Sequence, residues 1–335
     1  MERRRKLELA WIVPALAFTL ANGVLAYALL PASVNFASGL QVLPFWIMMT
    51  AGLLILRFIV KVFQMMFAGV ENPARALAQW VVANAGLVAI IFLLMLLAWA
   101  NMMAFLYIKP VLNIFVPFGA DPLLADIDKA LFLGTDPWRL LDWMNVNFAN
   151  MFYHPGWFAL MIIALMFLFA SPSSPEKTAM ALSYFLLWSI VGPLVHTILP
   201  AGGPIFFERL GHGDRFATLS PGDQTMRAAD YLWRNFSNGE FSPAAGISAM
   251  PSMHVTMSAW TVLCFYYFAR SWWIPVAAIS GYIALLSVAL GWHYAIDGIA
   301  GAALAAATFY LLRRYLPRSS SEPSTGSTPL QAISR

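Results

Sequence analysis

Two stretches of the sequence join a short polar opening to a long apolar run. They are AMPSMHVTMSAWTVLCFYYFA (residues 249–269) and GWHYAIDGIAGAALAAATFYLL (residues 291–312). Each run approaches the roughly 20 residues that a helix needs to cross the hydrocarbon of a bilayer. The runs are apolar on all sides, which is typical of helices that do not face water. The two stretches therefore predict membrane-spanning helices with polar residues gathered at one end.

The composition of the whole chain is also that of a membrane protein. Apolar residues make up 60% of the 335 residues and charged residues only 11%, against roughly 45–50% and about 25% in soluble domains. This composition excludes an ordinary soluble enzyme, a disordered acidic chain and a basic nucleic-acid-binding domain, so we expect no nucleic-acid partner. The single cysteine, Cys264, excludes a disulfide within the chain and a cysteine zinc cluster.

Apolar segments of this kind recur eight times and predict an all-α, polytopic membrane protein with about eight transmembrane helices. Lys and Arg residues at the N-terminus, in 61–75, at 177, at 270 and in 313–318 then all fall on one side, which we expect to be cytoplasmic. Both termini would then be cytoplasmic. We expect the protein to lie in a cell (inner) membrane. The segments run from Leu9 to Leu30, Leu40 to Val60, Trp80 to Ile108, Phe152 to Ala170, Ala179 to Leu199, Met253 to Ala269, Trp273 to Gly291 and Ile296 to Leu312.

The stretches between the spans suggest how the chain is divided. Residues 121–150 are amphipathic, and Asp121-Pro122 and Asp136-Pro137 each read as an N-cap followed by proline at the first helical position. We expect two short helices there, at the outer membrane surface. The predicted units are two N-terminal transmembrane helices (1–78), a catalytic membrane domain (79–316) with an outer loop (200–250), and a disordered cytoplasmic tail (317–335).

The scarce polar residues gather where chemistry is possible. The chain crosses the membrane twice between His254 and His293, so both histidines return to one face, and Asp297 lies one helical turn after His293. A neutral imidazole can attack phosphorus, a carboxylate can fix its tautomer, and a second imidazole can protonate the departing oxygen. The helix start at Ser252 offers N–H groups to phosphate oxygens. The set predicts phosphoryl transfer and requires neither a metal nor another cofactor.

At these residues the chain resembles the type-2 phosphatidic acid phosphatase (PAP2) superfamily. Pro251-Ser252-Met253-His254 resembles its second motif, PSGH, and His293 with Asp297 resembles the end of its third, SRxxxxxHxxxD. MPSMH combined with WHYAIDGIAG is most similar to the branch that includes inositol phosphorylceramide synthases, which are inositolphosphotransferases. The resemblance implies a six-helix catalytic bundle, in which His293 is the nucleophile, Asp297 assists it and His254 is the acid.

The chain departs from the family pattern where that pattern places cations. Leu286-Ser287 stand in place of the third motif's Ser-Arg, Met253 stands in place of a glycine, and the first motif, KxxxxxxRP, is absent. Lys109, Arg209 or Arg215 could supply the missing charge, and Arg209 is the best placed by order along the chain. The predicted phosphate-binding residues are Ser252, Met253 and Arg209.

These features favour a membrane phosphotransferase that moves a phosphate-bearing headgroup from a lipid donor to a hydroxyl acceptor through a phosphohistidine. The donor would be a phospholipid or an isoprenoid lipid phosphate, bound on the extracytoplasmic face. One alternative is a phosphatase acting on phosphatidic acid or an isoprenoid diphosphate. A second is a non-enzymatic lipid-binding or transport scaffold, which the missing arginines favour. We interpret His154, His196 and His212 as polar anchors, and Gly298 and Gly301 as helix-packing positions.

Overall fold

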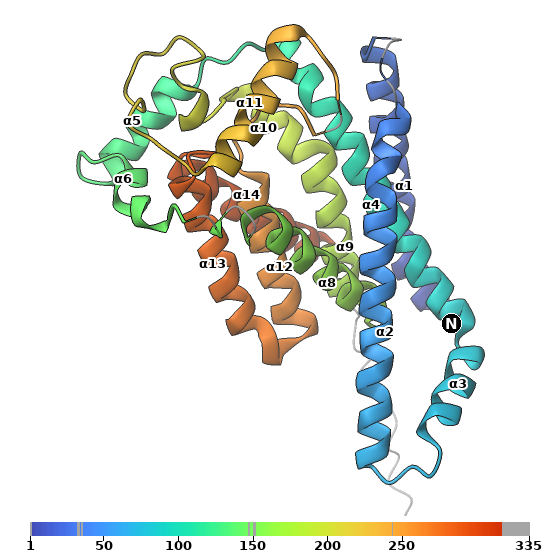
Figure 1. The fold of residues 1–335 in the computed structure, drawn as a ribbon. Coiled ribbons are helices and arrows are strands. Elements are labelled where there is room, and N and C mark those ends of the chain that lie inside the picture. Colours follow the sequence, from blue (N-terminus) through green and yellow to red (C-terminus); the bar gives the residue numbers. More distant parts are fainter. Residues whose placement is uncertain are drawn as a thin grey trace, which may run out of the picture.

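The computed structural model describes residues 2–31, 34, 36–146, 148–149, 152–242 and 244–316 (Figure 1). Every regular element in these residues is a helix. The predicted tail, 317–335, lies outside the described residues. The longer helices are α1 (Glu2–Leu29), α2 (Leu43–Phe67), α3 (Pro73–Ala83), α4 (Ala85–Phe115), α5 (Asp121–Leu131), α8 (Trp157–Ala170), α9 (Pro175–Leu186), α11 (Asp223–Asn238), α12 (Met253–Phe268), α13 (Trp273–Ala289) and α14 (Ala295–Tyr315). The shorter elements are η1 (Phe36–Val42), α6 (Pro137–Leu141), η2 (Asp142–Met144), η3 (Phe152–Gly156), η4 (Leu187–Val191), α10 (Gly192–Ile198), η5 (Pro204–Phe206) and η6 (Arg270–Trp272).

Seven helical segments within the described ranges are long and apolar enough to cross a membrane, so the all-α, polytopic prediction is confirmed. The predicted segment from Met253 to Ala269 is the exception, because α12 has only 16 residues. At 1.5 Å per residue it extends about 24 Å, less than the roughly 30 Å of hydrocarbon. No residue of α12 is exposed, and it packs against α8, α13 and α14. Because protein surrounds it, α12 does not have to match the thickness of the lipid.

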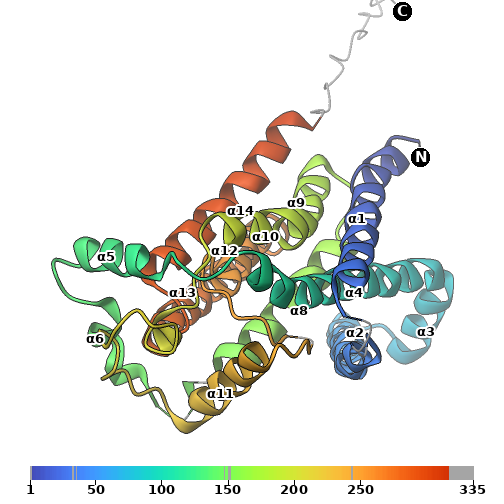
Figure 2. The same ribbon diagram turned by 90° about the horizontal axis from the view of Figure 1, so that it is seen from above.

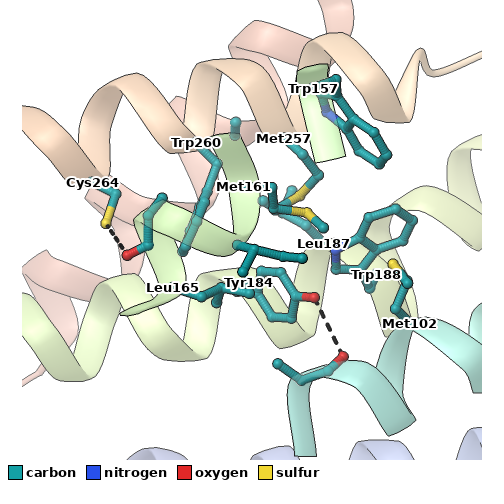
Figure 3. Close-up of a cluster of buried hydrophobic side chains, with 14 of the residues drawn as sticks. Met102, Trp157, Met161, Leu165, Tyr184, Leu187, Trp188, Met257, Trp260 and Cys264 are labelled. Carbon is teal, nitrogen blue, oxygen red and sulfur yellow. Dashed lines mark hydrogen bonds between the residues drawn. The ribbon is translucent and has the colours of Figure 1, made fainter. Parts of the chain in front are cut away.

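The packing around α12 fixes the position of its ends. Figure 3 shows the side chains that α8, α9 and α12 bury against one another. The Trp260 indole of α12 donates to the Met180 carbonyl at 3.1 Å and to the Ser183 hydroxyl at 3.0 Å, both on α9. The Cys264 thiol donates to the Ala164 carbonyl of α8 at 3.4 Å. Since polar groups buried in such a core need partners, these bonds specify the register of α12 against its neighbours.

The first helix packs into the bundle. α1 lies along α4 and α9, and seen from above it stands beside α2 on the side of the molecule opposite to α5 and α6 (Figure 2). The Lys177 ammonium of α9 donates to the Glu8 carboxylate of α1 at 2.9 Å. Farther along, the Asn101 amide of α4 donates to the Thr19 hydroxyl of α1 at 3.1 Å. The division into residues 1–78 and 79–316 stays a prediction.

The elements α5, α6 and α11 gather at one end of the bundle (Figure 1). α5 and α6 are the two short helices predicted for residues 121–150. α11 occupies 16 residues of the segment predicted as an outer loop, and Gly239 ends it in the left-handed conformation (φ 67°) that glycine adopts without strain. The segment predicted as a loop thus carries an amphipathic helix, which covers this end of the molecule.

Of the two aspartates predicted as N-caps, Asp136 has that position and Asp121 does not. Ala120 is the N-cap of α5, and the Asp121 carboxylate instead accepts hydrogen bonds from the backbone N–H groups of Gly202 and Gly203. Asp136 does stand at the N-cap of α6, but its carboxylate accepts from the guanidinium of Arg215 rather than from the helix. Both carboxylates therefore tie short helices to the segment that follows α10.

Candidate active site

Two helix starts meet at the end of the bundle where α5 and α11 lie. α12 begins after Ser252 and α14 begins after Tyr294. A side-chain carbon on Gly301 of α14 would collide with the Thr256 hydroxyl of α12 and come within 3.0 Å of the Ser252 carbonyl. Gly301 is therefore a helix-packing position, as predicted, because only glycine allows this approach. The approach brings the loop of His293 close to the start of α12.

A third segment, Pro200–Pro204, lies between these two starts. The Ala201 carbonyl accepts a hydrogen bond from the Ala249 N–H at 2.7 Å, just ahead of α12. Gly203, at φ 99°, packs directly on the Trp292 carbonyl, where any side chain would collide. The Gly202 and Gly203 N–H groups bind Asp121 of α5. Three segments far apart in sequence are thus joined by backbone contacts beside His293, and the Asp121 carboxylate joins α5 to them.

The ring of His293 is oriented mainly by a carbonyl. Its Nδ1 lies 2.8 Å from the Ala249 carbonyl oxygen, so Nδ1 carries the proton and Nε2 keeps its lone pair. The nearer carboxylate oxygen of Asp297 is 3.7 Å from Nδ1 and accepts the Tyr294 N–H at 2.8 Å. Asp297, fully buried, can stabilise positive charge on the imidazole. The expectation that it fixes the tautomer directly is corrected, because the Ala249 carbonyl does so.

His254 lies beside a second histidine. Its Nε2 is 3.2 Å from Nδ1 of His154, which stands in η3 at the start of α8. The His254 ring stacks on Tyr153 with ring centroids 4.7 Å apart, and Trp157 packs against it at 4.3 Å. The ring centroids of His254 and His293 are 6.3 Å apart. The structure thus brings together the two predicted catalytic histidines and adds His154, which sequence analysis interpreted as an anchor.

All three rings line one cavity of about 460 Å³, within the range of small-molecule sites. Its walls are mostly aromatic and aliphatic and include Ala228, Tyr231 and Leu232 of α11. Lys109, near the end of α4, is the one Lys or Arg among the described residues that line it, and no Asp or Glu lines it. The cavity is therefore an apolar chamber with a single fixed cation beside three imidazoles.

Of the three predicted phosphate-binding residues, only Met253 lines the cavity. Met253 lines the cavity, and the N–H groups of Met253 and His254 have no hydrogen-bond partner within the described ranges. Ser252 is buried outside the lining, and its hydroxyl caps α12 by accepting the Val255 N–H. The Arg209 guanidinium binds the Asp230 carboxylate at 2.6 Å and borders a separate surface hollow. Ser252 and Arg209 thus lie outside the described lining, whose cation is Lys109. Phosphate binding by Ser252, Met253 and Arg209 stays a prediction.

Two buried carboxylates of α5 support the loop that carries His293. The Asp128 carboxylate accepts the N–H groups of Ala295 and Ile296, at 2.6 and 2.9 Å, and so caps α14 from outside. Burial raises the pKa of Asp128 to about 6, although these two hydrogen bonds oppose the rise. The Asp121 carboxylate accepts the Tyr294 hydroxyl at 2.9 Å, and burial likewise raises its pKa against the lowering effect of its hydrogen bonds.

The remaining candidates stand outside the cavity. The His196 Nε2–H donates to the Asn113 amide oxygen at 2.7 Å in the bundle interior. His212 lies 3.9 Å from the Asp121 carboxylate. Arg215 is held by Asp126 and Asp136; burial lowers the pKa of its guanidinium, but the hydrogen bonds to both carboxylates outweigh burial and raise it. Among the described residues no group of three or more His, Cys, Asp or Glu side chains is arranged to hold a metal ion.

Comparison with known protein families gives one match. The sequence pattern described as the PAP2 superfamily matches residues 123–311, which is more than half of the chain. The chain therefore belongs to the PAP2 superfamily, and its membership supports an enzyme of the lipid phosphatase or phosphotransferase type. Neither the comparison with curated proteins nor the one with solved structures gives a significant match.

Proposed function

We propose that this protein is a lipid phosphotransferase that takes a phosphate-bearing headgroup from a phosphodiester phospholipid and passes it to a hydroxyl acceptor. The observation that carries the proposal is the charge of the cavity, where Lys109 is the one cation in the described lining. A phosphodiester has one negative charge, which Lys109 can neutralise. A phosphate monoester or diphosphate carries more charge, and uncompensated charge in an apolar chamber is costly.

The chemistry follows from the hydrogen bonds of the two predicted catalytic histidines. Nε2 of His293 has the lone pair and attacks phosphorus, forming the N–P bond while the P–O bond to the glycerol oxygen breaks. The leaving oxygen takes a proton from His254. In the second step the acceptor hydroxyl attacks phosphorus, the N–P bond breaks, and the hydroxyl proton returns to His254. Asp297, 3.7 Å from His293, stabilises the charge on the phosphorylated imidazole.

Two further features support transfer over hydrolysis. The free N–H groups of Met253 and His254 at the start of α12 offer donors for the equatorial phosphate oxygens. The apolar face of α11 closes one wall of the cavity and limits access of water. A lipid alcohol can enter such a chamber from the membrane. The site would open to the extracytoplasmic face, as the distribution of Lys and Arg predicts.

The test is an acceptor-dependence assay on the full chain reconstituted in vesicles. Phosphodiester lipids with labelled headgroups should transfer the label to added lipid alcohols, and product should scale with the alcohol. His293→Ala should abolish transfer and the covalent phosphoenzyme. Rapid release of inorganic phosphate from phosphatidic acid, unaffected by any alcohol, would establish the phosphatase instead. Lipid binding without turnover of either donor would establish the scaffold.

A further inference from the structure

Within the cavity His154 is a titratable side chain for which the reaction proposed above has no use. It stands at the start of α8, 100 residues before His254, and its Nδ1 lies 3.2 Å from Nε2 of that ring. The side chain is exposed to the cavity rather than packed away. A hydrogen bond between two imidazoles requires that one nitrogen donates and the other accepts. The pair therefore fixes one proton on the line between the two rings.

The surroundings limit how His254 can move. Tyr153 stacks on one side of its ring and Trp157 packs against it, while Nδ1 of His254 has no hydrogen-bond partner within the described ranges. The other titratable groups in the described lining of the cavity are His293, Lys109 and the hydroxyls of Tyr153 and Tyr231. None of them is hydrogen-bonded to His154 among the contacts of the described residues. The geometry leaves Nδ1 of His254 available for the substrate.

We propose that His154 is a positioning residue for the general acid. The Nε2–H of cationic His254 donates to neutral His154, which directs the Nδ1–H of His254 toward the leaving oxygen. His154 would thus do for His254 what the Ala249 carbonyl does for His293. In the first step the Nδ1 proton of His254 goes to the glycerol oxygen as the P–O bond breaks, and the acceptor hydroxyl returns it in the second. This inference rests on the proposed function, because it assigns a role within that reaction.

The assignment makes a prediction about leaving groups. An alkoxide needs a proton as it departs, and a positioned general acid contributes about 10²–10⁴ in rate. A nitrophenolate is stable without that proton, so a donor with 4-nitrophenol in place of diacylglycerol reports attack by His293 without the acid. A defect in His154 that acts through His254 should therefore appear with the phospholipid donor and largely vanish with the nitrophenyl donor.

The experiment compares His154→Leu and His154→Asn in the reconstituted full chain. The amide oxygen of asparagine and Nδ1 of histidine are each three covalent bonds from Cα. Asparagine can therefore accept the His254 N–H, whereas leucine cannot. We expect His154→Leu to lower kcat by about 100-fold with the phospholipid and by less than about fivefold with the nitrophenyl donor. His154→Asn should restore most of the phospholipid rate. His254→Ala should repeat the selectivity of the leucine variant.

Three outcomes would overturn the inference: equal losses with both donors, which indicate a structural role, no loss with either donor, or a loss with the phospholipid that His154→Asn does not restore. Failure of the proposed function looks different, because His293→Ala would then retain turnover or the wild type would transfer nothing from a phosphodiester. Thermal unfolding of each variant in detergent checks that the rates compare folded proteins.

Discussion

At the level of single residues, the proposed function assigns recognition of the donor's charge to Lys109, which lines the cavity. Replacing it with methionine keeps a long apolar stem and removes the charge. A hydrogen bond to a charged group contributes about 1.5–3 kcal/mol, so we expect Lys109→Met to raise KM for the phosphodiester about 10–100-fold. Arg209→Met is the matched control, since its guanidinium binds Asp230 outside the cavity, and it should change KM less than about twofold. Equal effects of the two variants would contradict the assignment.

A second residue-level prediction concerns Asp128. Its pKa is raised from 3.8 to about 6, so between these values the folded protein holds a proton that the unfolded chain has lost. The stability that this proton provides is complete below pH 4 and is lost as the pH rises through about 6, a change of up to about 3 kcal/mol. The melting temperature of the wild type relative to Asp128→Asn should therefore fall between pH 4 and pH 7.

The matched control for this measurement is Asp142→Asn, which alters an exposed carboxylate at the same end of the molecule. A melting difference between wild type and Asp128→Asn that stays constant across this pH range would contradict the assignment of the buried titration to Asp128. The hydrogen bonds that Asp128 accepts from the start of α14 would then be unaffected by its protonation.

Sequence spacing predicted the residues that share a helix start but not the direction of long side chains. His254, His293 and Asp297 follow from the two motifs and from counting membrane crossings. Arg209 was chosen by order along the chain, which says nothing about Asp230 turning it away from the cavity. His154 carried a usable signal, because the predicted topology places the start of its span at the same membrane face as the other two histidines.

At the level of helices, the contact between α12 and α14 sets the distance between the two histidine loops. Gly301→Ala would place a methyl group against the Thr256 hydroxyl and the Ser252 carbonyl. Such overpacking costs about 1–3 kcal/mol and would shift the start of α14, so we expect a lower melting temperature and reduced transfer. Gly281→Ala on α13, where nothing lies within 4 Å, is the control and should be neutral or stabilising. Similar behaviour of the two variants would contradict this role for Gly301.

Helix existence was easier to predict than helix ends. The amphipathic pattern predicted α5 and α6. However, the Asp121 carboxylate accepts hydrogen bonds from the N–H groups of Gly202 and Gly203 rather than from its own helix. Local cap preferences cannot anticipate backbone donors that lie 81 and 82 residues farther along the chain. α12 ends at Phe268, one residue before the predicted Ala269, whereas α4 continues to Phe115, beyond the predicted Ile108. Hydropathy measures the environment of a segment, and tertiary packing decides where the helix stops.

At the level of the whole molecule, the fold places the polar chemistry at one end of an apolar bundle. α4, η3, α12 and the loop before α14 bring Lys109, His154, His254 and His293 to the cavity, and α11 lines one of its walls. Composition predicted the membrane environment, and the positive charges predicted a consistent direction for the chain. Neither can reveal which four segments meet, because that depends on the packing of helices far apart in sequence.

The last prediction concerns the orientation of this molecule in its membrane. Leu133, between α5 and α6, is 96% exposed at the end that carries the cavity, whereas Phe67 is 90% exposed at the end of α2, well away from α5 and α6 in Figure 1. In a Cys264→Ser background, a membrane-impermeant maleimide should label Leu133→Cys on intact cells. It should label Phe67→Cys and Glu2→Cys only after permeabilisation, because the Lys and Arg clusters of the connecting segments share that side. The opposite pattern would place the active site in the cytoplasm and would require a donor from the inner leaflet.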